Sequence, residues 1–128
     1  MKRYALEIRT IKSGHPMGPL SPAGRLNSHY FYCAADIYAV DGHAVATRPI
    51  PESLVGFGRW LMSLPDDRRA ACVMGPQAWH SVLDPGDRRG FRDDEFANRI
   101  HDDHLHVEVE LPESAYRHLG NNVPQEGA

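Results

Sequence analysis

The strictest pattern of hydrophobic and polar positions in this chain lies between His104 and Leu111. Apolar residues alternate there with polar ones, and the apolar set is Leu105, Val107, Val109 and Leu111. The polar set is His104, His106, Glu108 and Glu110. Successive side chains of a β-strand point to opposite faces. The segment therefore predicts a strand with one face on the core and a polar face that carries two histidines.

Three further stretches predict strands or turns of a small sheet. Residues 4–11 alternate loosely and end in β-branched residues, and residues 70–74 form a short apolar run. Residues 36–45 predict a hairpin, because strand-favouring residues flank the turn pair Asp41-Gly42.

The clearest helix is predicted over residues 51–64, where apolar residues fall at helical spacing after Pro51. Proline and glycine mark residues 13–24 as a loop, and residues 76–96 look irregular and charged. A short helical turn is expected at residues 114–119. These elements indicate the α+β class, as a small antiparallel sheet with one main helix and long loops.

Length and composition indicate one globular domain. The chain has 128 residues, of which 41% are hydrophobic and 24% charged. We expect the domain to span residues 1–120, followed by a disordered tail at residues 121–128. A net charge of −3 argues against a nucleic-acid partner. No apolar run has membrane-spanning length, so no membrane partner is expected.

The N-terminal residues and the histidine and cysteine content give expectations about localisation and metal binding. The N-terminal residues lack the apolar run of a signal peptide, so a cytoplasmic location is expected, unless lysis releases the chain or it is excised from a longer exported protein. Eight histidines are many for this length and hint at a metal. The two cysteines make no disulfide framework. Cys33 is expected to pack as a small hydrophobe, with metal ligation as the alternative.

Two distant segments together offer a set of metal ligands. His29 and Asp36 stand seven residues apart, with Asp36 at the mouth of a predicted strand, and His106 lies on the polar face of another. Two imidazoles and a carboxylate can fill three corners of a tetrahedron. Three protein ligands with a fourth position left for water are typical of catalytic zinc sites.

The residues before His106 supply candidates for acid–base chemistry. In a regular strand His104 shares the face of His106, where it could donate a hydrogen bond to a substrate or an oxyanion. Asp103 has the opposite parity and approaches the metal-bound water only if the lead-in at residues 100–103 is irregular or bulged. Asp102 has the right parity and is the reserve candidate for the base.

The pattern resembles the zinc peptidases of the lysostaphin, D-Ala-D-Ala peptidase and hedgehog superfamily. The nearest branch is the D-alanyl-D-alanine carboxypeptidase and dipeptidase group with its L-alanyl-D-glutamate endopeptidase relatives. The first motif of that group reads Ser-x-His-x-x-Gly-x-Ala-x-Asp, and His29, Ala34 and Asp36 fall in register with it. Asn27 stands at its serine position and Tyr32 at its glycine position.

The second motif of the group is an acid three residues before a histidine, often within His-x-His. Asp103, His104 and His106 match it. The resemblance implies that His29, Asp36 and His106 bind Zn²⁺ and that Asp103 is the catalytic base.

The resemblance also implies a substrate class. Family members hold the substrate with an arginine near the metal, for which Arg25 is the candidate and Arg9 the reserve. The implied activity is zinc-dependent hydrolysis of a peptide or amide bond beside a D-amino acid in a peptidoglycan stem peptide, so the partner is a small peptide. The sequence leaves open the oligomeric state and the choice among carboxypeptidase, dipeptidase and endopeptidase.

Two other functions stay open at this point. One is an amide or peptide hydrolase of specialised metabolism that uses the same site. The other is a zinc-binding module without turnover. The other histidines and Trp79 are expected to have structural roles only; these histidines are His15, His43, His80, His101 and His118.

Overall fold

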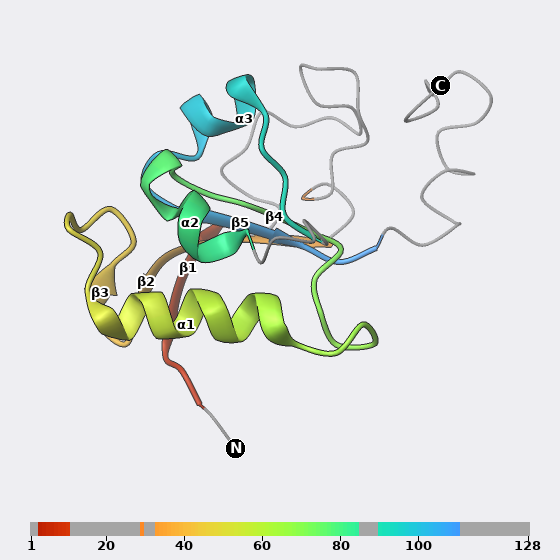
Figure 1. The fold of residues 1–128 in the computed structure, drawn as a ribbon, viewed down its shortest axis with the longest axis horizontal. Helices are drawn as coiled ribbons and strands as arrows, with labels where there is room; N and C mark the ends of the chain where they lie inside the picture. The colour runs from red at the N-terminus through yellow and green to blue at the C-terminus, as the bar shows by residue number, and fades with distance from the viewer. Residues whose placement is uncertain (1–2, 11–28, 30–32, 85–89, 111–128) are drawn as a thin grey trace.

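A small antiparallel sheet organises the structure, a computed structural model that describes residues 3–10, 29, 33–84 and 90–110 (Figure 1). Its strands are β1 (Leu6–Thr10), β2 (Ala34–Val40), β3 (His43–Ala44), β4 (Cys72–Met74) and β5 (Leu105–Glu108). The helices are α1 (Glu52–Ser63), the 3₁₀ turn η1 (Gln77–Trp79), α2 (His80–Leu83) and α3 (Glu95–Ile100). The α+β class expected from the sequence is confirmed.

Strand β2 is the centre of the sheet. The strand order is β1-β2-β5-β4, and β3 pairs with the end of β2 through the turn at Asp41 and Gly42. All of these pairings are antiparallel. The first half of β2 pairs with β5, so two segments far apart in the sequence lie side by side along their length.

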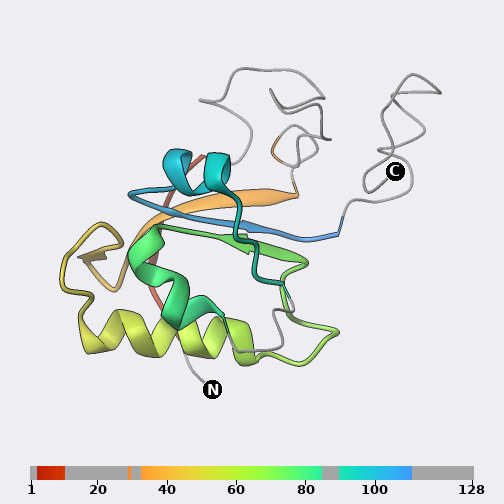
Figure 2. The same cartoon turned by 45° about the horizontal axis from the view of Figure 1, so that its top comes forward.

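Helices α1 and α2 lie on one side of the sheet and α3 lies on the other (Figure 2). On the α1 side, Leu54 and Phe57 of the helix and Val73 and Leu105 of the strands are buried in one apolar cluster. This confirms the core face predicted for β5, although Val109 beyond its end is 55% exposed. The observed strand is shorter than predicted and ends at Glu108.

Trp79 lies in the core, as the sequence analysis expected. Its side chain is fully buried, and its indole Nε1 donates a hydrogen bond to the carbonyl oxygen of Val45 at 3.1 Å. A buried indole needs such a partner, because an unpaired N–H group in the core is costly. The bond ties η1 to the segment that follows β3.

The sequence prediction was wrong for much of residues 76–96, which were expected to be irregular. The segment contains η1 and α2, and α3 begins at its end. Asp94 caps α3, because its side chain accepts a hydrogen bond from the backbone N–H of Ala97 at 3.0 Å. An aspartate followed by Glu95 was a usable helix signal that the charge of the segment obscured.

Several sequence predictions lie outside the described residues: the loop at residues 13–24, the helical turn at residues 114–119 and the tail at residues 121–128. In the part of the chain that the structure describes, no helix has both the length and the apolar character needed to cross a membrane.

Two glycines of α1, Gly56 and Gly58, should respond differently to substitution by alanine, because only Gly58 packs against α2 and Trp79. A Cβ at Gly58 would meet Val82 Cγ1 at 2.5 Å and Trp79 Cζ3 at 3.1 Å, whereas a Cβ at Gly56 would meet nothing within 4 Å. Gly56→Ala should raise the free energy of unfolding by roughly 0.5–1 kcal/mol through helix propensity. Gly58→Ala should lower it by about 1–3 kcal/mol, because the core is overpacked there.

Urea unfolding of both variants beside the wild type measures this difference. Equal stabilisation by the two substitutions would mean that α1 does not pack on α2 through Gly58.

Candidate metal centre

The pairing of β2 with β5 brings the two sequence motifs together. Asp36 lies directly opposite His106 in the antiparallel ladder. Side chains at such paired positions are close neighbours on one face of the sheet. This face is opposite to the one that holds Leu105, and α3 lies on its side of the sheet (Figure 2). His29, from the chain before β2, joins the pair, and all three side chains are buried.

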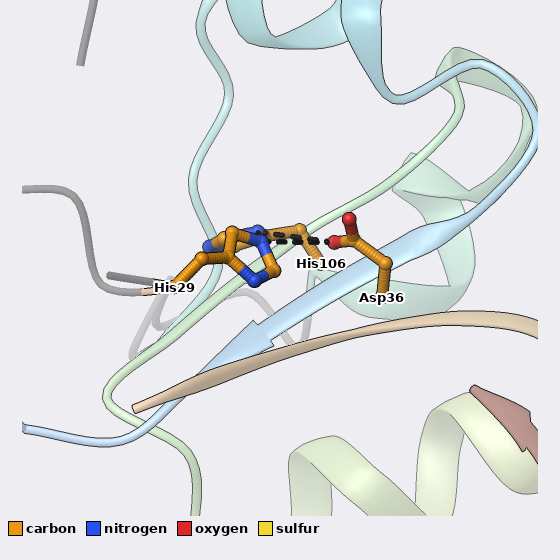
Figure 3. A group of neighbouring side chains, drawn as sticks. All are labelled: His29, Asp36 and His106. Carbon is orange, nitrogen blue, oxygen red and sulfur yellow. Dashed lines mark hydrogen bonds and ion pairs between the residues drawn. The ribbon is translucent and has the colours of Figure 1, made fainter. Parts of the chain in front are cut away.

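The donor atoms of His29, Asp36 and His106 form a compact triangle. His29 Nε2 lies 3.0 Å from His106 Nδ1 and 3.2 Å from Asp36 Oδ1. His106 Nδ1 lies 3.3 Å from the same oxygen. Figure 3 shows the two imidazoles on the same side of Asp36, with dashed lines that run from them to one oxygen of its carboxylate.

This triangle fits a tetrahedral metal ion. Ligands at the usual zinc distances of about 2.0–2.1 Å stand roughly 3.3–3.4 Å apart at the corners of a tetrahedron. The three measured separations of 3.0, 3.2 and 3.3 Å come close to that edge. Two imidazoles and a carboxylate are ligands that zinc accepts. The residues can therefore hold a metal ion, and zinc is the ion that the sequence predicts.

Glu108 orients the ring of His106. Its carboxylate Oε1 accepts a hydrogen bond from His106 Nε2 at 2.8 Å, which leaves Nδ1 facing Asp36 and His29. Metal-binding histidines usually donate their second ring nitrogen to such an acceptor. Burial alone would lower the pKa of His106, but hydrogen bonds with Asp36 and Glu108 outweigh it and raise the pKa to about 9. The alternation pattern placed Glu108 on this face without identifying its role.

Asp103 and His104 form a hydrogen-bonded pair at the edge of the centre. The chain bends over residues 102–104 before β5 begins, so the irregular lead-in that Asp103 requires is present. His104 Nδ1 donates to Asp103 Oδ1 at 2.8 Å. The Asp103 side chain is 63% exposed, whereas His104 is buried with its Nε2 at 3.7 Å from Asp36 Oδ1.

Arg48, which is not part of the candidate centre, stabilises the bend at residues 102–104. The guanidinium of Arg48 donates to the backbone oxygen of Asp102 at 3.4 Å and to that of Val45 at 2.8 Å. The Asp102 residue itself is exposed.

His101 is a neighbour of the centre that the sequence did not assign to it. It follows α3 as the C-cap, and its buried ring lies 5.2 Å from the ring of His106 and 5.0 Å from that of His104, measured between centroids. Burial lowers the pKa of His101 to about 4, so the ring is neutral at ordinary pH. The expectation of a satisfied core histidine is met, because Nδ1 donates to the Ala97 carbonyl. Only the unexpected helix α3 brings the ring here.

Of the two arginines proposed to bind substrate, the described residues include only Arg9. Arg25 lies outside the described residues. The reserve candidate, Arg9, places its guanidinium 4.6 Å from the ring centroid of Tyr38, and that ring stacks on His104 at 4.7 Å. A guanidinium over an aromatic face is attracted by the ring electrons. Arg9 therefore stands one aromatic ring away from His104.

Cys33 stays outside the candidate ligand sets. Neither of the two ligand groups found among the described residues includes it. Its side chain is partly buried, and burial together with nearby Glu108 raises the pKa of its thiol. A raised thiol pKa disfavours the thiolate that metals bind.

Comparisons of this chain with protein-family models, with curated proteins and with solved structures found no match.

The contact between Glu108 and His106 yields a prediction about metal affinity. Glu108→Ala should weaken zinc binding on the order of 10–100-fold, because His106 loses the acceptor that fixes its ring. Glu110→Ala is the matched control, since Glu110 is exposed two residues later along the chain. Competition with a chromogenic chelator measures both affinities, and equal affinities in the two variants would contradict the orienting role of Glu108.

Proposed function

We propose that this chain is a zinc-dependent hydrolase of peptide or amide bonds, with the fold and chemistry of the lysostaphin, D-Ala-D-Ala peptidase and hedgehog superfamily. The triangle of His29, Asp36 and His106 carries the proposal, because its donor separations suit a tetrahedral ion. The neighbouring Asp103–His104 pair adds acid–base groups. Ligands and acid–base groups together are what metal-assisted hydrolysis needs.

Each residue has a role in this mechanism. Zinc bound by His29, Asp36 and His106 would lower the pKa of a water molecule and polarise the scissile carbonyl. Asp103 accepts the proton of the attacking water on its carboxylate and returns it to the leaving amine. In its doubly protonated form, His104 would hold Asp103 through Nδ1 and donate a hydrogen bond from Nε2 to the oxyanion that develops on the carbonyl.

The exposure of Asp103 supports its proposed role in proton exchange. Its exposed carboxylate meets solvent while its Oδ1 holds His104. The buried Asp36, by contrast, is enclosed by imidazoles and serves as a ligand. Two carboxylates in such different environments suit two different roles.

The proposed substrate is a short polar peptide with a bond beside a D-amino acid, as in a peptidoglycan stem peptide. The motif resemblance supports this class. An arginine that binds the substrate carboxylate would favour a C-terminal dipeptide, and Arg25 and Arg9 are the two candidates. Substitution of the arginine that does so should raise KM more than it lowers kcat.

A substrate panel tests the proposal. The zinc-loaded protein is incubated with muropeptide stem fragments, with D-Ala-D-Ala and with an all-L peptide, and free amine is followed over time. We expect release from a substrate that contains a D-residue and none after chelation. Cleavage of only the all-L peptide would refute the cell-wall substrate. A zinc-loaded protein that cleaves no member of a broad amide panel would be a binding module.

The two adjacent aspartates provide a test of the catalytic base. Asp103→Ala should lower turnover on the order of a hundredfold or more, because the general base is lost. Zinc at His29, Asp36 and His106 should remain, and plasma-emission analysis checks this.

Asp102→Ala is the matched control for the same loss of charge. Asp102 is exposed, and the bend depends on its backbone oxygen instead of its side chain. Inactivation by Asp102→Ala with full activity of Asp103→Ala would reverse the assignment.

A further inference from the structure

Asp36 has two sets of imidazoles as neighbours. His29 and His106 form the first set, described above. His101 and His104 form a second set, and one donor atom from each lies within 4.8 Å of the other and of a carboxylate oxygen of Asp36. Both histidines are buried, with 6% and 7% of their surfaces exposed. The buried Asp36 carboxylate therefore belongs to two candidate ligand groups, and histidines of both approach its Oδ1.

The hydrogen bonds of the second set fix where the ring lone pairs lie. His101 Nδ1 bonds the carbonyl oxygen of Ala97 at 2.7 Å. A carbonyl only accepts, so Nδ1 carries the hydrogen and the lone pair of the neutral ring is on Nε2.

His104 is held in the same way. Its Nδ1 donates to the carboxylate of Asp103 at 2.8 Å, and its Nε2 faces Asp36 Oδ1 at 3.7 Å. With Nδ1 protonated, the neutral ring keeps its lone pair on Nε2. Histidine ligands of metals are usually held like this, with the second nitrogen donating to a carbonyl or a carboxylate.

The positions of these rings are set by three different elements. The C-cap of α3 holds His101, the bend before β5 holds His104, and β2 holds Asp36. Tyr38 stacks on His104 at 4.7 Å with an interplanar angle of 21°, which fixes the plane of that imidazole. A set of donors that packing and hydrogen bonds fix in advance is what a metal site requires.

We propose that Asp36, His101 and His104 hold a second divalent metal ion, and that the Asp36 carboxylate bridges it to the ion at His29 and His106. The inference rests on the proposed first metal site, because the two sites share Asp36. Two imidazoles and a carboxylate suit zinc, and Mn²⁺ and Co²⁺ are also bound by such ligands. Exogenous water would complete the coordination.

A second ion would change the chemistry of the centre. Paired ions about 3.5–4 Å apart stabilise both the attacking and the leaving oxygen of a displacement. With a second ion bound, His104 would be a ligand, and the ion would supply the oxyanion stabilisation that His104 would supply in the one-ion form. Asp103 then orients a ligand in addition to moving a proton.

Metal stoichiometry tests the inference without any need for activity. The metal-free chain is titrated with Zn²⁺, and native mass spectrometry counts the bound ions. We expect two ions per chain for the wild type and one each for His101→Ala and His29→Ala. His43→Ala is the control and should keep two, because His43 is exposed in β3. Circular dichroism of each variant verifies that it is folded.

A spectroscopic measurement on the wild type makes the test independent of the variants. With two equivalents of Mn²⁺, electron paramagnetic resonance should show a spin-coupled pair, because one carboxylate bridges the ions. A wild type that saturates at one ion, or two Mn²⁺ ions without coupling, would overturn the inference.

The outcomes separate this inference from the proposed function. One ion that is lost in His29→Ala and kept in His101→Ala leaves the first site standing and refutes the second. Two coupled ions in a protein that hydrolyses no amide support the inference and refute the hydrolase. No bound ion in the wild type refutes both.

Discussion

The antiparallel pairing of β2 with β5 is the constraint on which the candidate site depends. It places Asp36 opposite His106 across more than sixty residues of intervening chain. Because side chains alternate along a strand, a slip of one residue would turn His106 toward the core and Leu105 toward the centre. The apolar face opposes such a slip, since Leu105 is fully buried against the helices. Packing on one face of the sheet thus fixes the chemistry on the other.

The two faces of the sheet differ in the kind of side chain that they bury. The face toward α1 and α2 is apolar, and its side chains need only to pack closely. Gly58 and Trp79 are an example, because a Cβ at Gly58 would be too close to the Trp79 ring. The opposite face carries a buried carboxylate and several buried imidazoles, which would be costly without partners. Hydrogen bonds to Glu108, Asp103 and the Ala97 carbonyl satisfy the outward nitrogens of three of these rings. The inward Nδ1 of His106 contacts His29 and Asp36, where a proton or a metal ion can be held.

The sequence predicted what depends on local periodicity and spacing. Alternation predicted β5 and its two faces, and the spacing of His29 and Asp36 predicted two of the three candidate ligands that the structure brings together. The sequence did not predict which further residues tertiary packing brings to the candidate site. A six-residue helix has too few turns for a periodic signal, and with only the cap at Asp94 to mark it, α3 was missed, and with it the placement of His101. The direction of Asp103 was open because a bend has no fixed parity.

A cluster of this kind links stability to metal binding. Charged and polar groups in the interior reduce the net free energy of folding unless each of them is paired. Ligands that come from separate segments are brought together only in the folded chain, so the free energy of metal binding adds to that of folding. Here the candidate ligands come from the chain before β2, from β2 itself, and from β5. An ion at Asp36 would therefore reinforce the same strand pairing that assembles its site.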